Sequence, residues 1–397
     1  MKEGWKYKRL GEICDFQNGF AFKSSLFEQS GEPIIRISDI QNGVINDKKV
    51  VYFNPDSYKE NLSRFKVYPN DILIAMSGAT TGKVGINKTK TTFYLNQRVG
   101  VFRENSKILD HYFLLYFLIA KSEEGLKLAI GAAQPNLSTE QIKNYSIPVP
   151  SLAEQQQIVS FLDSEFEKID ALKANAEEQL QAAKDLFQKA LKEMLTPKEG
   201  WEEKKLGDIC TIKGGKRVPK GYKLESEPTK HVYIRVADFN NNGSVDVNNL
   251  LYINDEVYEQ IKRYTISEED VYISIAGTIG KAGIIPSNLN GANLTENACK
   301  LVLNGLVDKK YIYFYTLHPT FKQQVMRSTK IGAQPKLALT RLADVVVCFP
   351  KNKETQLKVV LLLERLQESI KQLQDNYNET IILCNDLKQS LLKRIFE

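Results

Sequence analysis

The chain has 397 residues and a formal net charge of +6, with 42% hydrophobic and 26% charged residues, as in an ordinary soluble globular protein. This length predicts two or three domains, each able to bury its own core. There is no apolar run of 18 residues and no signal-peptide pattern in MKEGWKYKRL, so we expect a cytoplasmic protein with no membrane partner. Three histidines and no Cys-x-x-Cys spacing give little support for a metal site.

Charge is distributed unevenly along the chain. The net charge is +5 over residues 1–150, −4 over 151–196, +4 over 197–350 and +1 over 351–397. Two basic regions therefore alternate with two that are not basic. A polyanionic partner that contacts only the first kind of region would produce this pattern.

The second half of the chain repeats the first. The paired segments are WKYKRLGEIC (5–14) with WEEKKLGDIC (201–210), IIRISDIQNG (34–43) with YIRVADFNNNG (233–243), 70–86 with 269–284, and 130–138 with 331–339. The order is preserved, and the period is too long for a solenoid, so we infer a duplicated domain. Cys14 and Cys210 are equivalent and apolar-flanked, which fits reduced core thiols.

Both copies predict a mixed α/β (α+β) domain rich in strands. Stretches rich in β-branched and aromatic residues occur at 33–38, 71–76, 230–236 and 271–275, separated by Asn/Gly turns. One helix per domain is expected, at 111–120 and at 310–319. Both segments are apolar nearly all round, which indicates burial.

The connecting segments have a different composition. Residues 151–196 contain no Gly or Pro before the helix-ending Pro197, and Ser151 with Glu154 forms a capping-box pattern at the start. Apolar residues recur there at spacings of three and four, and the pattern returns in 351–397. The seam positions are Leu162, Phe166, Ile169, Leu180 and Phe187 in the first helix, and Leu363, Leu366, Ile370, Leu373 and Leu387 in the second.

We therefore expect four parts: a first domain (1–150), a central coiled-coil helix (151–196), a second domain (197–350) and a C-terminal coiled-coil helix (351–397). Each helix can reach roughly 65 Å at 1.5 Å per residue. If the helices pack antiparallel, two similar domains are held apart by a rod with an approximate two-fold axis. The seam needs no second copy of the chain.

No constellation of catalytic residues is evident. GATTGKV (78–84) lacks the four-residue spacing and the Ser or Thr of a phosphate-binding loop, so it predicts a tight turn between strands. NPDSY (54–58) only faintly matches the base-holding motif of amino-methyltransferases, and no glycine-rich loop for a methyl donor follows a strand. We expect no catalysis by this chain alone.

Candidate DNA-binding residues lie mainly in loops and where the two copies diverge. The most basic stretch is KGGKRVPKGYK (213–223), and such a loop can clamp a phosphate or be merely solvated. The candidates are Lys23, Arg36, Lys83, Gln97, Arg98, Gln134, Lys213, Lys216, Arg217, Lys220, Arg235, Lys281, Asn297, Lys300, Gln334 and Lys336. Structural alternatives stay open: Arg36 and Arg235 can pair with Asp39 and Asp238, and the glutamines can cap turns.

The ordered combination of motifs resembles the specificity subunits of type I DNA restriction–modification systems. The features that carry the resemblance are W-x-x-x-x-L-G-[ED]-I-C after Trp5 and Trp201, the SG/AG-x-x-GK turns, the G-A-x-Q-P elements, and IPVPSLAEQQQI (147–158). The second copy of the last motif, CFPKNKETQLKVV (348–360), keeps Pro350, Glu354 and Gln356 but loses the double proline. The resemblance spans essentially the whole chain.

The resemblance implies two target-recognition domains, each reading one half of an interrupted DNA site. It also implies helices that set the gap and dock two modification (methyltransferase) subunits, and further restriction/translocase subunits as partners. S-adenosylmethionine, ATP and Mg2+ would belong to those partners, which form an adenine DNA methyltransferase or restriction endonuclease with this chain. The rival hypothesis is a coiled-coil scaffold without DNA specificity, which predicts no salt-dependent DNA affinity.

Overall fold

The structure is a computed structural model that describes residues 5–41, 43–122, 136–329 and 335–397. The chain forms two compact units. The first comprises Met1–Glu177 with Glu379–Glu397, and the second comprises Glu178–Asn378. Each unit therefore contains one globular domain together with part of both long helices.

In the described part of the first domain, the strands form two sheets and a ribbon. The elements are β1 (Lys6–Arg9), α1 (Leu10–Ile13), β2 (Cys14–Asn18), β3 (Phe27–Glu28), β4 (Glu32–Ile35), β5 (Ile40–Gln41), β6 (Val44–Ile45), β7 (Val51–Phe53), β8 (Lys66–Val67), β9 (Ile72–Ala75), β10 (Val84–Ile86), β11 (Phe93–Leu95), β12 (Val99–Glu104), α2 (His111–Ala120), α4 (Thr139–Lys143) and β13 (Ser146–Val149). One sheet has the order β2-β12-β9-β10-β6-β5 and the other β3-β7-β4-β11-β8, while β1 pairs antiparallel with β13.

Burial explains the predicted elements of this domain. All four residues of β9 are buried, and most of α2 is buried as its apolar sequence predicts. The Asp110 side chain accepts hydrogen bonds from the backbone N–H groups of Tyr112 and Phe113 and so caps α2. Between β9 and β10 the chain makes the predicted tight turn, with positive φ at Gly78 and Gly82.

The described part of the second domain repeats this plan with fewer strands. Its elements are β14 (Trp201–Lys205), α6 (Leu206–Ile209), β15 (Cys210–Gly214), β16 (His231–Ile234), β17 (Leu251–Ile253), α7 (Asp255–Ile261), β18 (Val271–Ser274), β19 (Ala282–Gly283), β20 (Asn293–Leu294), β21 (Ala298–Leu303), α8 (Lys309–Leu317), α9 (Pro319–Ser328), α10 (Leu339–Ala343) and β22 (Val346–Pro350). The sheets run β15-β21-β18-β19 and β17-β16-β20, with β14 paired to β22.

One predicted helix differs from the structure. The segment 310–319 is not one helix: α8 ends at Leu317, and Pro319 begins α9. Proline fits the first turn of a helix but not its interior, so the chain bends before it. His318 lies between the two helices, and its side chain accepts a hydrogen bond from the N–H of Thr320.

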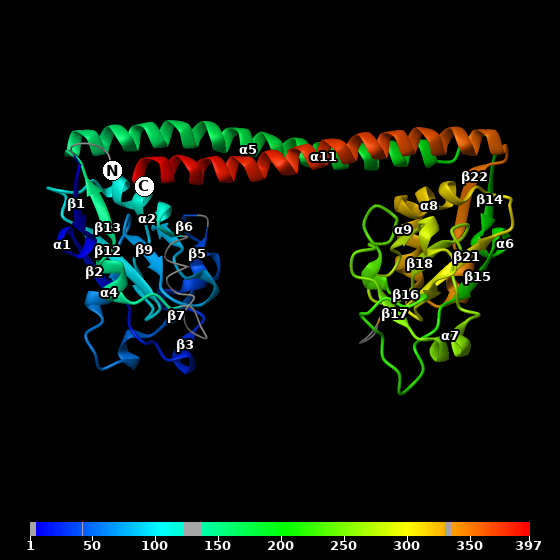
Figure 1. Ribbon diagram of the computed structural model, residues 1–397, viewed down its shortest axis with the longest axis horizontal. Coiled ribbons are helices and arrows are strands. Elements are labelled where there is room, and N and C mark those ends of the chain that lie inside the picture. The colour runs from blue at the N-terminus through cyan, green and yellow to red at the C-terminus, as the bar shows by residue number, and fades with distance from the viewer. Residues whose placement is uncertain (1–4, 42, 123–135, 330–334) are drawn as a thin grey trace. The chain divides into compact units, whose positions relative to one another are not determined.

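Two helices of 44 residues each, α5 (Leu152–Leu195) and α11 (Lys353–Phe396), confirm the predicted long helices. In the first unit they pair antiparallel: Asp170 bonds Lys388 (2.6 Å), and Lys173 bonds Asn385 (3.1 Å). In the second unit Leu191 and Val360 belong to one buried core. In each unit a domain helix, α2 or α8, lies next to the long helices (Figure 1). In the first unit the rings of Phe113 and Phe117 pack on that of Phe396.

The seam prediction is partly wrong. Buried seam residues are Leu162, Ile169, Leu363 and Ile370, while Phe166, Leu180, Phe187 and Leu366 are half-buried. Leu373 and Leu387 are instead 42% and 49% exposed. A straight helix drifts by about 20° per heptad relative to a strict seven-residue repeat. The residues that come later at one heptad position of α11, Leu373 and Leu387, are therefore turned away from the seam.

The cysteines match the prediction. All five are free and buried, and burial raises the pKa of the Cys14 and Cys210 thiols to about 12. The Cys14 and Cys210 thiols are thus inert core groups at working pH. Among the described residues, no helix combines the length and the apolarity needed to cross a membrane.

Candidate nucleic-acid interface

Three segments of the first domain meet at one corner of its larger sheet. Phe20 donates its N–H to the carbonyl of Leu95 (2.8 Å), and Met76 donates its N–H to the carbonyl of Arg98 (2.9 Å). Leu137 in turn donates to the carbonyl of Met76 (2.7 Å). We call this meeting of the loops after β2 and β9 with the loop before β12 the first corner.

The second domain has an equivalent corner. Lys216 donates its N–H to the carbonyl of Leu294 (2.8 Å), and Ile275 donates to the carbonyl of Asn297 (2.8 Å). Leu337 donates to the carbonyl of Ile275 (2.9 Å), as Leu137 does to Met76 in the first corner. The second corner is therefore built by the same backbone contacts as the first.

A glycine makes the close approach possible in both corners. A Cβ atom on Gly19 would lie 2.1 Å from the carbonyl oxygen of Asn96, and one on Gly215 would lie 2.1 Å from that of Thr295. Side-chain carbon atoms do not come this close to backbone oxygen, so only glycine fits. The repeat thus preserves the backbone of the corner.

The side chains at these corners differ. The first corner carries Phe20 with Gln97 and Arg98, and both of the latter are exposed. The second carries Lys216 and Arg217 in the matching loop, and Glu296 and Asn297 in place of Gln97 and Arg98. At these matched positions one corner therefore has an aromatic ring and a single cation, and the other is dominated by charge.

In the second corner a salt bridge orients the exposed arginine. Nε of Arg217 lies 2.6 Å from Oε1 of Glu296. Burial acts to raise the pKa of Glu296, but hydrogen bonds from Arg217, its own backbone and Thr295 hold the pKa below its ordinary value. The carboxylate is thus ionised and presents acceptor oxygens beside a guanidinium.

Each corner is flanked by a cation over an aromatic ring. A shallow hollow in the first corner is lined by Phe16, Gln17, Asn18, Gly19, Phe20, Ala21, Arg64, Phe65 and Thr139. The guanidinium carbon of Arg64 lies 4.6 Å from the centre of the Phe65 ring, and in the second corner Nζ of Lys216 lies 5.7 Å from that of Tyr264.

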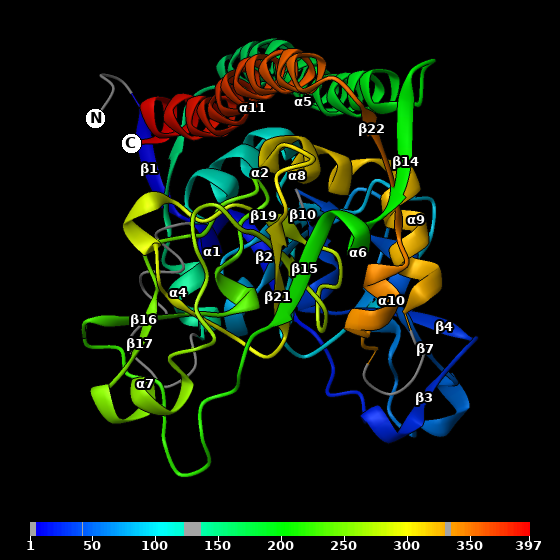
Figure 2. The ribbon, with the colours of Figure 1, turned by 90° about the vertical axis from the view of Figure 1, so that its right-hand side faces the viewer.

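The predicted basic loop adds charge at the second corner. It follows β15 and extends far from the sheet, on the side of its domain away from the long helices (Figure 2). Its cations Lys216, Arg217, Lys220 and Lys223 are all exposed, and so is Lys213 near the end of β15. The equivalent stretch of the first domain, residues 17–23, holds Lys23 as its sole cation.

The remaining candidates divide into exposed and engaged residues. Lys23, Lys83 and Lys336 are exposed, and Lys336 forms a β-bridge with Ala276 at the second corner. Gln134 and Gln334 lie outside the described residues. The exposed cations are thus available to a phosphate backbone.

Four candidate cations are held inside their own domains. Arg36 bonds Asp39 and the carbonyl of Lys49, and Arg235 bonds Asp238 and the carbonyl of Asn249. The structure thus contains the Arg–Asp pairs that were the alternative to base contact. Lys281 donates to the carbonyl of Phe239. Lys300 lies 2.7 Å from Asp270, with both side chains largely buried.

Some residues of the corners were not among the sequence candidates. Arg64, Phe65 and Glu296 are the clearest cases. Aligning 96–98 with 295–297 in the repeat would have singled out Glu296. No sequence signal placed Arg64 beside Phe20, because their proximity depends on the tertiary fold.

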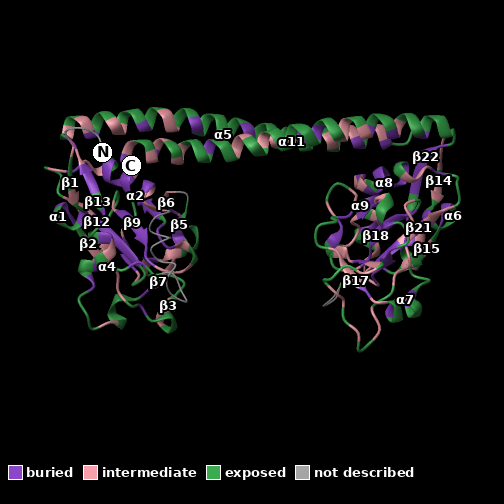
Figure 3. Cartoon of the chain, viewed as in Figure 1, coloured by how far each residue is buried: buried purple, intermediate pink, exposed green. Residues whose placement is uncertain are grey.

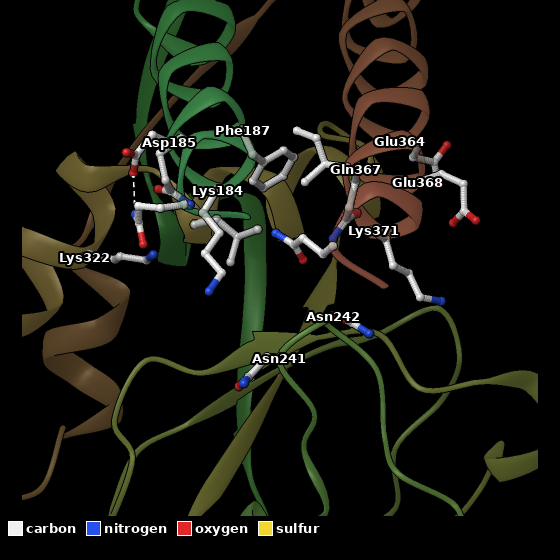
Figure 4. A pocket seen from close by; sticks show the side chains of 15 residues that line it. Lys184, Asp185, Phe187, Asn241, Asn242, Lys322, Glu364, Gln367, Glu368 and Lys371 are labelled. Atoms are coloured by element: carbon white, nitrogen blue, oxygen red, sulfur yellow. Dashed lines mark hydrogen bonds between the residues drawn. The ribbon is translucent and has the colours of Figure 1, made fainter. Parts of the chain in front are cut away.

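The second unit also contains a groove between α5, α11 and the loop at Asn241 and Asn242 (Figure 4). Its lining mixes Lys184, Lys322 and Lys371 with Asp185, Glu364 and Glu368. Burial lowers the pKa of Lys322. Across the described ranges, no cluster of three or more His, Cys, Asp or Glu residues could hold a metal ion.

The architecture defines a duplicated mixed α/β protein with two long helices, and comparison with known proteins identifies its family. A model of the type I restriction modification DNA specificity domain matches residues 2–182 and again residues 198–392. The chain is 26% identical to the EcoBI specificity subunit of Escherichia coli, covering 100% of this chain and 86% of that protein. It is 24% identical to the EcoKI specificity subunit of Escherichia coli K12, covering 100% and 89%.

Solved structures share the fold. A chain from a study of complex assembly and conformational transition of the type I R-M system matches with a TM-score of 0.78 at 19% identity, covering 99% of this chain and 97% of that one. The HsdS subunit from Thermoanaerobacter tengcongensis matches with a TM-score of 0.53 at 18% identity, covering 100% and 97%. The chain belongs to the family of type I restriction–modification DNA specificity subunits, which are non-catalytic parts of their complexes.

Proposed function

We propose that each corner reads one half of an interrupted, asymmetric DNA site. The observation that carries this proposal is the pair of corners with the same glycine-dependent backbone and different side chains. Gln and Asn can bond adenine with two hydrogen bonds, Arg can bond guanine, and Glu accepts from cytosine. Gln97 and Arg98 in one corner, and Arg217, Glu296 and Asn297 in the other, would therefore read different bases.

The exposed lysines would contact phosphates. Lys220 and Lys223 are exposed in the basic loop and Lys213 is exposed in β15, while Lys23, Lys83 and Lys336 are exposed in their respective domains. Such contacts fix register and orientation on the duplex and make the affinity fall with salt. Arg36, Arg235, Lys281 and Lys300 would support the binding surface from within.

The two long helices would set the gap between the half-sites. Each has 44 residues, or about 66 Å at 1.5 Å per residue. Lengthening or shortening both by one heptad should change the gap and leave both half-sites as they are. In this proposal the chain consists of two recognition domains and two spacer helices, divided at residues 150, 196 and 350.

The helices would also dock two modification (methyltransferase) subunits. Apolar residues are 42% to 57% exposed at matching positions: Phe161, Leu172 and Leu387 in the first unit, and Leu362, Leu373 and Leu186 in the second. The helices are largely exposed along their length (Figure 3). Exposed apolar patches of this kind mark protein–protein contacts.

The position of these residues supports docking on the outside of the helix pair. Phe161 lies about 160° around α5 from Val159, which packs on the first domain, at 3.6 residues per turn. Leu362 lies about 160° around α11 from Val360, which belongs to the core of the second unit. Two equivalent patches suit two copies of one partner.

Catalysis would belong to the partners. The modification subunits would methylate adenine with S-adenosylmethionine, and restriction/translocase subunits would use ATP and Mg2+. Without them this chain would bind DNA and do no chemistry. A cytoplasmic location follows from the DNA partner and the composition.

The test is to delete the gene in its native host and compare single-molecule maps of methylated DNA. Loss of methyladenine from one bipartite motif, with all other motifs unchanged, would support the proposal and reveal both half-sites. An unchanged map, in a strain shown to express the complex, would favour a coiled-coil scaffold without DNA specificity.

A further inference from the structure

A fully buried glutamine joins each long helix to its domain. Gln155, in the first turn of α5, donates from Nε2 to the carbonyls of Ile108 and Pro150, both at 2.9 Å. Its Oε1 accepts the N–H of Asp110 at 2.8 Å. The side chain is 0% exposed, although glutamine is ordinarily a surface residue.

The second unit repeats this arrangement. Gln356, in the first turn of α11, donates to the carbonyls of Pro350 (2.8 Å) and Leu306 (3.4 Å). Its Oε1 accepts the N–H of Asp308 at 2.9 Å, and it too is 0% exposed. Unlike the side chains of the corners, this contact is the same in both copies.

Each glutamine connects three parts of its unit. These are the start of the long helix, the end of the strand that leads into it, and the loop that caps α2 or α8. The acceptor of the capping bonds is Asp110 in the first unit and Asp308 in the second. Both amide hydrogens and the amide oxygen are used, so the side chain is held in one orientation.

We propose that Gln155 and Gln356 are positioning residues that fix the angle between each domain and its helices, and so restrict the DNA gap that the protein accepts. This inference rests on the proposed function. Helix length alone sets the gap only if the joints at the domains are stiff. Apolar contacts are non-directional, whereas hydrogen bonds weaken steeply when misaligned.

The required stiffness can be estimated. A domain of about 150 residues is roughly 38 Å across. A rotation of about 5° at the helix would therefore move the far side of the domain by roughly 3.4 Å, one base-pair step. The tip of the basic loop lies on that far side in the second unit (Figure 1). A small increase in the range of angles between domain and helix would thus allow binding to sites whose gap is one base pair longer or shorter.

The experiment measures gap selectivity with the full chain in complex with its modification subunits. The probes are duplexes that carry both half-sites at the native gap or at one base pair more or less. We expect Gln155→Met with Gln356→Met to reduce the preference for the native gap by roughly tenfold, while discrimination against a base change within either half-site stays as in the wild type.

Gln156→Met is the matched control, because Gln156 is the exposed neighbour of Gln155. It should leave the gap preference unchanged. Should the methionine variants fail to fold, Gln155→Asn with Gln356→Asn retains the amide but is too short to reach all three partners, and the same loosening is expected.

Two results would overturn the inference and are distinguishable. If the wild type is gap-selective and folded variants are equally selective, the glutamines are structural only and the proposed function stands. If the wild type shows no preference for a bipartite site at any gap, the proposed function fails and this inference fails with it.

Discussion

At the first corner the protein presents Phe20, Gln97 and Arg98, and at the equivalent positions of the second it presents Lys216, Glu296 and Asn297. Beneath these side chains, Gly19 and Gly215 allow the same close approach to a neighbouring carbonyl. The two copies have kept the glycine that allows the backbone of the loop to approach its neighbour, but they differ in the side chains that the loop exposes. The buried glutamines show the opposite behaviour, since both their identity and their contacts are the same in the two units. Divergence is thus found at the corners and not at the joints.

The largest expected effect would test the charge difference between the domains. Changing Lys213, Lys216, Lys220 and Lys223 together to Ala should lower DNA affinity by roughly 10²- to 10³-fold near physiological salt and flatten the salt dependence, because up to four phosphate contacts are lost. Fluorescence anisotropy over a salt series measures both. Changing four exposed lysines of α5, Lys168, Lys184, Lys189 and Lys192, is the control. An equal loss there would mean that net charge alone governs binding.

The apolar patches should behave alike, in contrast with the corners. Phe161→Asp or Leu362→Asp should each weaken one docking site by about tenfold or more and reduce the number of bound modification subunits from two to one, because an exposed apolar contact is replaced by a charge. Native mass spectrometry of the complex counts the copies. Ser160→Asp, at an exposed neighbouring position, should leave two copies bound. If the variant with both substitutions, Phe161→Asp and Leu362→Asp, still bound two modification subunits, these subunits would dock on another surface.

Single side chains of the corners should affect one half-site only. Arg98→Ala should relax one base position of the half-site read by the first domain, by about 1–3 kcal/mol, since an arginine contact to a base edge is lost. Asn297→Ala should do so in the other half-site. Selection from a randomised duplex library reports each position separately. Relaxation in both half-sites by one substitution would contradict independent reading.

The smallest expected effect is a pH dependence of opposite sign in the two units. A hydrogen bond with Glu104 raises the pKa of His111, whereas burial lowers the pKa of His318. The contribution of His111 is complete below its unfolded pKa, near 6.5, and is lost as the pH rises through its raised folded value. The penalty for charging His318 instead appears as the pH falls below about 6.5 and grows toward its lowered folded value.

Thermal melts of His111→Gln and His318→Gln at pH 5.5 and pH 8 would show this contrast. His111→Gln should cost more stability at pH 5.5 than at pH 8, by about 1 kcal/mol or less, because the charged pair is present only in acid. For His318→Gln the cost should be greater at pH 8. If the stability cost of both substitutions changed in the same direction between pH 5.5 and pH 8, the pKa values of the two histidines would not be shifted in opposite directions.

Periodic and repeated features were predictable from the sequence, and close approaches were not. The heptads predicted both 44-residue helices, and the apolar segment 111–120 predicted buried α2. The strict heptad failed at Leu373 and Leu387, where helical drift turns both side chains outward. Lys300 of β21 pairs with Asp270, which immediately precedes the neighbouring strand β18 and lies 30 positions away, so this pair depends on the strand register. The corners likewise depend on a fold that brings Gly19 against Asn96.

The division into units has a consequence for the order of synthesis. The second unit is one continuous stretch, Glu178–Asn378, but the first needs Glu379–Glu397 as well. Leu392 and Phe396 are buried in the core of the first unit with Phe113 and Leu162. A ribosome therefore delivers every residue of the second unit before the first can close its core. The domain translated first is the last to be completed, so a chain truncated after Asn378 would hold every residue of the second unit beside an incomplete first one.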